Sequence, residues 1–220
     1  MQGGYMNRIL RVHLSNRTWT TEELDEKLVR DFIGGRGFGA KFLYDDLKPG
    51  IDPLGEENEI IFIAGPLAAT GAQSCARFEI YFKSPQTGGY FQSSGGGFFA
   101  PEMKFAGYDA IIIKGKSEKP VYLWIHDDKV EFKDASYLWG LGLADTEQLI
   151  REELNDPYVR VAGIGPAGEN LVKYAGVFSD RRAAARGGGG AVMGSKNLKG
   201  VAVRGHQKVP IANNEAFQQA

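Results

Sequence analysis

The stretch DRRAAARGGGGAVMGSKNLKG, from Asp180 to Gly200, sets three arginines beside four consecutive glycines. Glycine loses more conformational freedom on folding than any other residue and adds no side chain to a core, so such a run weakens the element that contains it. A bound anion would offset this loss, because it needs bare backbone N–H donors at close approach and guanidinium groups that hold it. The alternative is a solvent-exposed turn.

The same stretch forms part of an internal echo. The first copy reads FIAGP, ARFEIYF, GGG and EMKFAGYDAIIIKG between residues 62 and 115, and the second reads AGIGP, VKYAGVFS, GGG and GSKNLKGVAVRG between residues 162 and 205. Each copy orders a strand that ends in Gly-Pro, a second strand, a triple glycine, a short helix with a lysine and a closing apolar strand. Chance similarity between glycine-rich segments is one reading. A genuine duplication would place the two glycine-rich turns on either side of one site.

Strand patterns dominate the chain. Alternating or wholly apolar segments predict strands over residues 8–14 (continued by TWTTEEL at 18–24), 59–64, 76–82, 109–115, 121–126, 129–134, 158–164 and 173–179. Periodic segments predict helices over 21–33, with Thr21 as N-cap, over 40–47 and over 144–154. Because strands and helices do not alternate regularly, we expect an α+β fold that is mostly β, with two mixed sheets, short helices and, from the echo, an internal duplication.

The composition excludes several classes of protein. The chain has 220 residues and a net charge of −1, whereas nucleic-acid-binding domains carry a strong basic excess, so no nucleic-acid partner is expected. The longest apolar run, IIFIAGPLAA at 60–69, is much shorter than the roughly 20 residues of a membrane-spanning helix. The N-terminus lacks the apolar segment of a secretion signal, and the single Cys75 excludes an internal disulfide framework. We therefore expect a cytoplasmic protein without a membrane partner.

Three long motifs identify a family. SPQTGGYFQSSGGGFFAPEMKFAGYDAIIIKG, GIGPAGENLVKYA and DRRAAARGGGGAVMGSKNLK together resemble the N-terminal domain of the aldehyde ferredoxin oxidoreductase family, and the resemblance extends from about Arg8 to Val209. It implies a mostly β domain on which a tungsten- or molybdenum-bis-pyranopterin rests, with a magnesium ion that bridges the two pterin phosphates. It also implies an enzyme that oxidises aldehydes, or related oxo compounds, to carboxylic acids with ferredoxin as electron acceptor.

The resemblance also assigns residues. Arg77 and Arg182 match arginines near the phosphates, and the turn SSGGG matches the family's NSGG, with Ser94 at the position of the asparagine. The backbone carbonyls of Ser94 and Ala183 match the magnesium ligands. Because these ligands are backbone oxygens, a different side chain need not abolish the magnesium site. The full set expected to bind the cofactor is Arg77, Ser93, Ser94, Gly95, Gly96, Gly97, Arg182, Ala183, Arg186, Gly187 and Gly188.

Other parts of such an enzyme are expected outside this chain. The family's 4Fe-4S cluster needs several cysteines, and the chain has one, so the cluster is expected in downstream domains. The resemblance also implies that the residues close to the metal lie in those domains, so no catalytic residue is expected here and the chain alone should be inactive. Residues 1–209 would form the pterin-binding domain, and 210–220 would begin a linker or helix towards a missing domain. Downstream domains or a partner subunit, ferredoxin and a homodimer of the full enzyme are the expected partners. The alternative is a non-catalytic binding module for a phosphorylated pterin or a nucleotide.

The arginine, cysteine, histidine and charged residues outside these motifs are mostly expected to have structural roles. Arg36 either joins the cofactor surface or simply follows the end of a helix. Cys75 is expected to be a small buried hydrophobe, and Glu102 and Lys104 are expected on the surface of a short helix. The histidines are scattered in sequence and none is expected to bind a metal; they are His13, His126 and His206. The strands at 121–134 are expected to cover a sheet edge.

Overall fold

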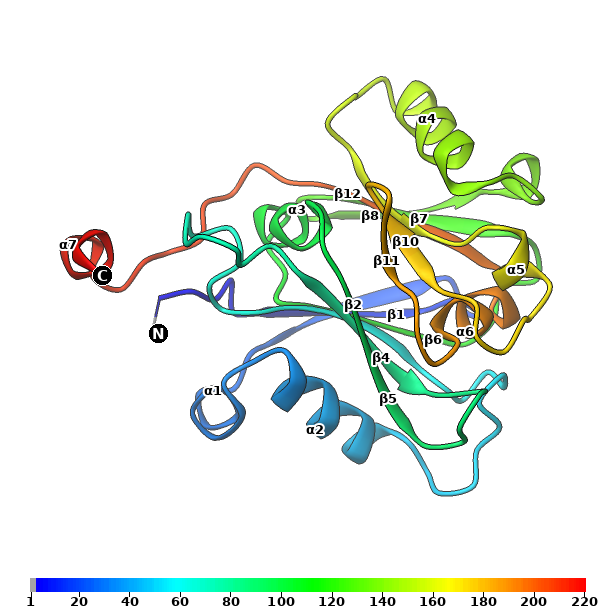
Figure 1. Cartoon of the computed structure of the whole chain (residues 1–220), viewed down its shortest axis with the longest axis horizontal. Coiled ribbons are helices and arrows are strands. Elements are labelled where there is room, and N and C mark those ends of the chain that lie inside the picture. Colours follow the sequence, from blue (N-terminus) through cyan, green and yellow to red (C-terminus); the bar gives the residue numbers. More distant parts are fainter. Residues whose placement is uncertain (1–2) are drawn as a thin grey trace.

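Two six-stranded sheets form the frame of the molecule (Figure 1). The computed structural model describes residues 3–220. In spatial order, the first sheet contains β2 (Thr18–Glu23), β1 (Arg8–His13), β6 (Ala110–Lys114), β3 (Ile60–Ala64), β4 (Phe78–Lys83) and β5 (Tyr90–Gly95). The second contains β11 (Arg182–Ala184), β10 (Val177–Ser179), β9 (Arg160–Gly163), β12 (Leu198–Arg204), β7 (Val121–His126) and β8 (Lys129–Asp134). The predicted α+β class with two mixed sheets is confirmed.

Helices connect and cover these sheets. They are α1 (Glu26–Phe32), α2 (Arg36–Asp46), α3 (Phe99–Phe105), η1 (Ser136–Leu138), α4 (Leu143–Glu153), α5 (Pro166–Glu169), α6 (Gly189–Ser195) and α7 (Asn214–Gln219). None of those in residues 3–220 is long and apolar enough to cross a membrane. Helix α7 buries none of its side chains and lies apart from the sheets beside the C-terminus.

The internal duplication is confirmed by the strand pairing. The first half runs from hairpin β1–β2 through β3, β4 and β5 to α3 and β6, and the second from hairpin β7–β8 through β9, β10 and β11 to α6 and β12. In each half the last strand lies parallel to the first strand and antiparallel to the third. The repeat is therefore longer than the echo in the sequence, because it includes the two hairpins.

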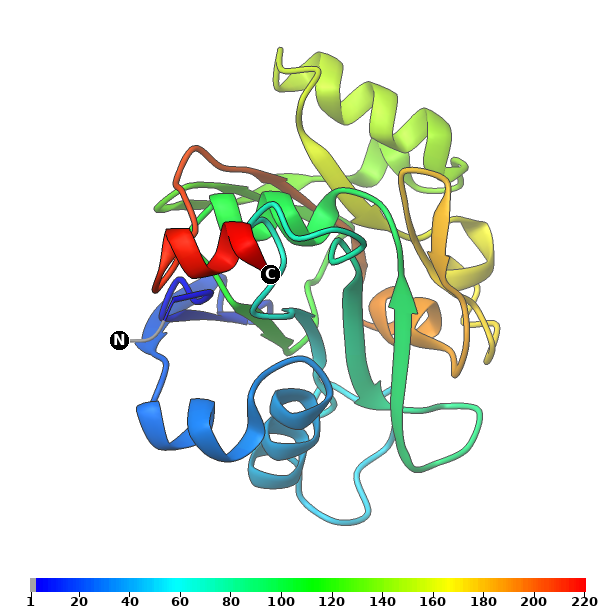
Figure 2. The same ribbon diagram turned by 60° about the vertical axis from the view of Figure 1, so that its left-hand side comes forward.

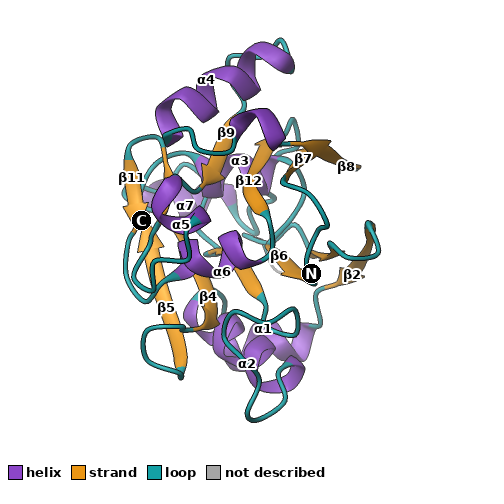
Figure 3. Cartoon of the chain, turned by 90° about the vertical axis from the view of Figure 1, so that its right-hand side faces the viewer, coloured by secondary structure: helices purple, strands orange, loops and turns teal. Residues whose placement is uncertain are grey.

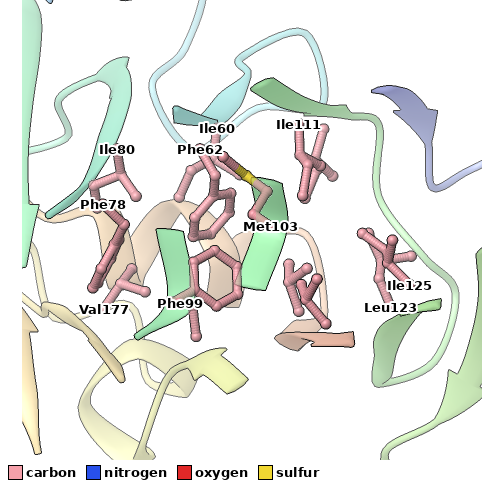
Figure 4. Packing of buried hydrophobic residues seen from close by; sticks show 14 of the residues in the cluster. Ile60, Phe62, Phe78, Ile80, Phe99, Met103, Ile111, Leu123, Ile125 and Val177 are labelled. Atoms are coloured by element: carbon pink, nitrogen blue, oxygen red, sulfur yellow. The ribbon is translucent and has the colours of Figure 1, made fainter. Parts of the chain in front are cut away.

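A shared core fills the space between the sheets. Helices α3 and α6 lie there, and Phe99 and Met103 of α3 pack against strands of both sheets (Figure 4). The strands are buried on both faces: Phe62 of β3 faces this core, while its neighbour Ile63 packs under α1 and α2. Helix α4 covers the outer face of the second sheet. This explains the wholly apolar strands, since neither face of the central strands meets water.

The predicted start of the first helix is wrong. Thr21 lies in β2 opposite Leu10, because the threonine-rich segment TWTTEE pairs with β1 as the second strand of a hairpin. Helix α1 begins at Glu26, and the Asp25 side chain caps it by accepting the Lys27 N–H at 3.1 Å. Helix α2 begins at Arg36, earlier than predicted. The helix predicted over 144–154 is observed as α4, and β8 forms the predicted sheet edge.

Two charged residues expected on the surface are buried. Glu102 and Lys104 lie on α3, which is enclosed between the sheets. The Lys104 Nζ donates to Asp109 Oδ1 at 2.5 Å and to the Gly4 carbonyl at 2.7 Å. Glu102 Oε1 accepts from Arg204 Nη1 at 2.9 Å. These partners come from neighbouring segments and make burial of the charges tolerable.

Candidate functional site

The two sheets meet along one side of the molecule. Their edge strands β5 and β11 lie side by side (Figures 2 and 3). The approach is close: a Cβ built on Gly95 would lie 3.2 Å from the backbone nitrogen of Ala184. The two strands run in opposite directions, since Gly97 lies beside Asp180 and Gly187 lies beside Phe91, so the two glycine-rich turns of the sequence echo lie at opposite ends of one paired edge.

Hydrogen bonds tie the two edge strands together at both of their ends. The Arg186 N–H donates to Ser93 Oγ at 3.1 Å, and the Phe98 N–H donates to Asp180 Oδ2 at 3.1 Å. Asp180 is itself held by Arg160, whose Nη1 lies 3.1 Å from its Oδ1. Nothing in the spacing of the sequence connects Asp180 with Phe98; in the fold Asp180 positions the glycine-rich turn that follows β5.

The hairpin turn between β10 and β11 determines where Arg182 lies. Asp180 and Arg181 connect β10 to β11 with φ values of 48° and 61°, as in the two-residue hairpin turns that match the twist of antiparallel strands. The chain reverses sharply and carries Arg182 to the edge. There the Arg182 Cγ lies 3.7 Å from the position that a Cβ on Gly96 would occupy. The glycine-rich turn after β5 therefore contacts the Arg182 side chain of β11.

The glycine run itself is buried, so the interpretation as a solvent-exposed turn is wrong. A Cβ on Gly187 would overlap the Phe91 ring, and one on Gly188 would overlap the Lys173 carbonyl. Gly189 begins α6 against Phe82, and the neighbouring Gly190 donates its N–H to the Ala175 carbonyl at 2.8 Å. Close packing of backbone against backbone requires these glycines whether or not a ligand is present.

Unpaired arginines surround the glycine-rich edge. Within residues 3–220, no carboxylate lies within ion-pair distance of the exposed Arg77, Arg182 or Arg186, whereas Arg160 and Arg204 are paired. Register places Arg77 at this edge, because its neighbour Phe78 pairs with Gly95. Guanidinium groups beside exposed backbone suit a phosphate, since they donate paired, charge-assisted hydrogen bonds. The donor set fits a phosphate-bearing group.

A cavity of about 360 Å³ opens on the α2 side of the same edge. Arg36 and Arg77 both line it, while Arg182 and Arg186 do not. Arg36 Nε donates to Gln92 Oε1 at 3.1 Å, so the guanidinium is held beside β5. The structure supports the interpretation that Arg36 belongs to the candidate cofactor surface, because Arg36 lines the same cavity as Arg77. Cys75 also lines this cavity and is partly exposed, which corrects the expected burial; the loop before β4 leaves it at the rim.

The remaining predicted residues lie on the two adjoining edges. Ser94 stands opposite Glu79 in the β4–β5 ladder, and Ala183 stands opposite Phe178 in the β10–β11 ladder. Gly97 follows β5 with φ 101°, a conformation that favours glycine. All the residues expected to bind the cofactor thus belong to one edge of the molecule, although only Arg77 among them reaches the cavity.

Comparison with known proteins agrees with this fold. The family model "Aldehyde ferredoxin oxidoreductase, N-terminal domain" matches residues 9–205 of this chain. Tungsten-containing aldehyde ferredoxin oxidoreductases of Pyrococcus abyssi and Pyrococcus furiosus are both 48% identical to it, over 98% and 97% of the chain. The chain therefore belongs to the aldehyde ferredoxin oxidoreductase family as its N-terminal domain.

The relatives are larger than this chain. It spans 36% of the length of both Pyrococcus proteins, which are oxidoreductases. A solved structure described as the active site complex BamBC of benzoyl coenzyme A reductase with 1,5 dienoyl-CoA has a TM-score of 0.98 and 44% identity. That match covers 100% of this chain and 34% of the other. The chain corresponds to one part of a larger enzyme.

Proposed function

We propose that this domain holds a tungsten- or molybdenum-bis-pyranopterin by its phosphates, in an enzyme that oxidises aldehydes or related oxo compounds to carboxylic acids with ferredoxin as electron acceptor. The observation that carries the proposal is the set of unpaired arginines along the edge formed by β5, β11 and the two glycine-rich turns that follow them. The 48% identity to tungsten-containing aldehyde ferredoxin oxidoreductases supports it.

Each residue has a defined task in this proposal. Arg77, Arg182 and Arg186 would hold phosphate oxygens by charge-assisted hydrogen bonds. The carbonyls of Ser94 and Ala183 would bind the bridging magnesium, for which oxygen ligands are suited. When bound, the cofactor would supply two-electron redox chemistry at its metal. The protein would supply position and charge, and the buried packing of the glycine run would keep the edge rigid.

Further parts of the enzyme would lie in other domains or in a partner subunit. The single Cys75 cannot ligate a 4Fe-4S cluster, so the proposal places the cluster there, together with the ferredoxin contact and any homodimer interface. Residues 210–220, which include α7, would lead towards them from the pterin-binding domain of residues 1–209. The proposed compartment is the cytoplasm. Because the benzoyl coenzyme A reductase complex has the same fold, we assign the choice of substrate to those other domains and expect residues 1–220 alone to be inactive.

The test compares two neighbouring arginines in the native protein that carries this domain. Arg182→Ala should lower tungsten or molybdenum retention about tenfold or more, since hydrogen bonds to charged groups contribute about 1.5–3 kcal/mol. Arg181→Ala is the matched control, because Arg181 is also exposed but lines a groove beside α4. Full metal retention in the Arg182 variant, with an unchanged unfolding temperature, would rule out the phosphate role.

A further inference from the structure

A cluster of two histidines and one aspartate lies away from the cofactor edge. His126 ends β7, Asp127 begins the turn to β8, and His206 follows the end of β12. His126 and His206, which are scattered in sequence, come together in the fold, where their ring centroids lie 5.4 Å apart. Strand β12 runs parallel to β7 with Arg204 opposite His126, so the chain brings His206 to the same end of the sheet.

The three ligand atoms lie close together. His206 Nδ1 is 2.9 Å and His126 Nε2 is 3.8 Å from Asp127 Oδ2, and all three lie within 4.8 Å of one another. A tetrahedral zinc ion with bonds of about 2.0–2.1 Å holds its ligand atoms roughly 3.3 Å apart. The two distances to Asp127 Oδ2 lie on either side of that value. Side-chain movements of about 1 Å would therefore complete the geometry.

Neighbouring groups already orient these side chains. Asp127 Oδ1 accepts the His206 backbone N–H at 2.9 Å, which leaves Oδ2 for the two rings. The Trp124 ring packs on His126 with a centroid distance of 5.4 Å. Such supporting contacts fix ligand orientation in metal sites.

We propose that His126, Asp127 and His206 bind one divalent cation of the zinc class and so fasten the β7–β8 hairpin to the segment that leaves β12. Imidazole nitrogens with one carboxylate oxygen suit zinc, and water would hold a fourth position. The side chains are 43%, 31% and 55% exposed, respectively, so the ion can enter from solvent.

The cation would fix the path of the chain beyond the second sheet. On its other side this segment is already anchored, since the Gly205 N–H donates to Glu102 Oε1 and the Gln207 N–H donates to the Phe105 carbonyl, at 2.9 and 2.8 Å. His206 lies between these anchors, and the segment continues to α7 (Figure 1). A metal bond at His206 would hold the segment from both sides. This site is independent of the proposed cofactor.

The test is zinc binding by the full chain. After removal of metals with a chelator, equilibrium dialysis against zinc sulfate should show one bound zinc that depends on the cluster. His206→Ala and Asp127→Asn should each weaken binding by at least about tenfold, because even loss of a supporting residue costs roughly 10–100-fold in metal affinity. Asp128→Asn is the matched control, since Asp128 lies in the same turn, is 73% exposed and pairs with Arg8.

Two further readouts make the outcome decisive. Zinc should raise the unfolding temperature of the wild-type chain but not of His206→Ala, and without zinc the two should unfold alike, because His206 is exposed. Zinc-edge X-ray absorption should show nitrogen and oxygen ligands at about 2.0–2.1 Å. Equal affinity in the wild type and the variant, absence of binding, or a sulfur shell at about 2.3 Å would overturn the proposal.

Discussion

The Arg186 N–H donates to the Ser93 hydroxyl at 3.1 Å, although 93 residues separate them in the chain. This bond joins strand β5 of the first half to the residue that precedes the glycine run of the second. Ser93→Ala should destabilise the fold by about 1 kcal/mol, the usual net value of one hydrogen bond, and should weaken cofactor retention. Ser94→Ala should leave both unchanged, because only the Ser94 carbonyl is expected to act. Denaturant unfolding and metal content measure the two effects, and equal behaviour of the two variants would contradict the assignment.

The buried glycine run predicts a large difference between two glycines. Gly188 has φ 87° and a Cβ there would overlap the Lys173 carbonyl, whereas Gly88 has φ 75° and open space around it. Gly88→Ala should cost about 1–2 kcal/mol of unfolding free energy from the left-handed backbone alone. Gly188→Ala should cost clearly more, because backbone must move as well. If denaturant unfolding gave the same loss of unfolding free energy for both variants, close packing would not explain why the chain has glycines at 187–190.

Equivalent lysines in the two halves bridge to equivalent segments. Lys104 Nζ donates to the Gly4 carbonyl before β1, and Lys196 Nζ donates to the Gly115 carbonyl before β7, at 2.7 and 3.1 Å. Both lysine side chains are fully buried. Burial lowers the pKa of Lys196 to about 8, and it also lowers the pKa of Lys104, which Asp109 opposes. The duplication has thus kept the bridge in both halves, with Asp109 as the carboxylate partner in the first.

Asp109 therefore supports a buried charge. Asp109→Ala should destabilise the protein by about 3–5 kcal/mol, because it leaves the Lys104 ammonium without its counter-charge. Adding Lys104→Met to that variant should restore part of the loss. Asp128→Asn, which removes an exposed ion pair with Arg8, should change stability by at most about 1 kcal/mol. Chemical denaturation of these variants and of Lys104→Met alone would measure this, and purely additive losses in the double variant would show that the pair is uncoupled.

Glu59 predicts how stability depends on pH. Its side chain is buried with no hydrogen-bond partner for Oε2, and burial, aided by Asp46 and opposed by Arg11, raises its pKa from 4.5 to about 7. A carboxyl with a raised folded-state pKa stabilises the fold fully below pH 4.5 and loses this contribution as the pH rises through about 7. Relative to the wild type, Glu59→Gln should become more stable over this window.

The matched control for that experiment is Glu57→Gln, since Glu57 is exposed and close in sequence. Its unfolding midpoint should follow the wild type at every pH. A constant difference between Glu59→Gln and the wild type from pH 4 to pH 8 would show that Glu59 does not titrate in the folded protein as expected.

The sequence predicted the arrangement of the strands better than the environment of the charges. The echo revealed the duplication because each half kept its Gly-Pro strand end, its glycine turn and its lysine. It did not reveal that hairpins β1–β2 and β7–β8 belong to the repeat, since their sequences differ while their pairing is the same. Glu102 and Lys104 looked like surface residues because their partners, Arg204 and Asp109, are found only in the folded protein.

The candidate site was predictable only in part. Arg77, Arg182 and both glycine turns do lie along one edge, as the motifs indicated, but their cofactor roles stay predictions. The reason for the glycine run could not be read from sequence, because the close approach of Gly188 to Lys173 is a tertiary contact. The same holds for Asp180, whose bond to the Phe98 N–H depends on how two distant turns meet.

The tungsten and molybdenum content of the native protein, purified without exposure to air, tests the central claim most directly. The account predicts that one of these metals is present in stoichiometric amount and is lost from the Arg182→Ala variant, because guanidinium groups at the glycine-rich edge hold the cofactor phosphates. Absence of both metals from a folded native protein with Arg77, Arg182 and Arg186 intact would contradict it.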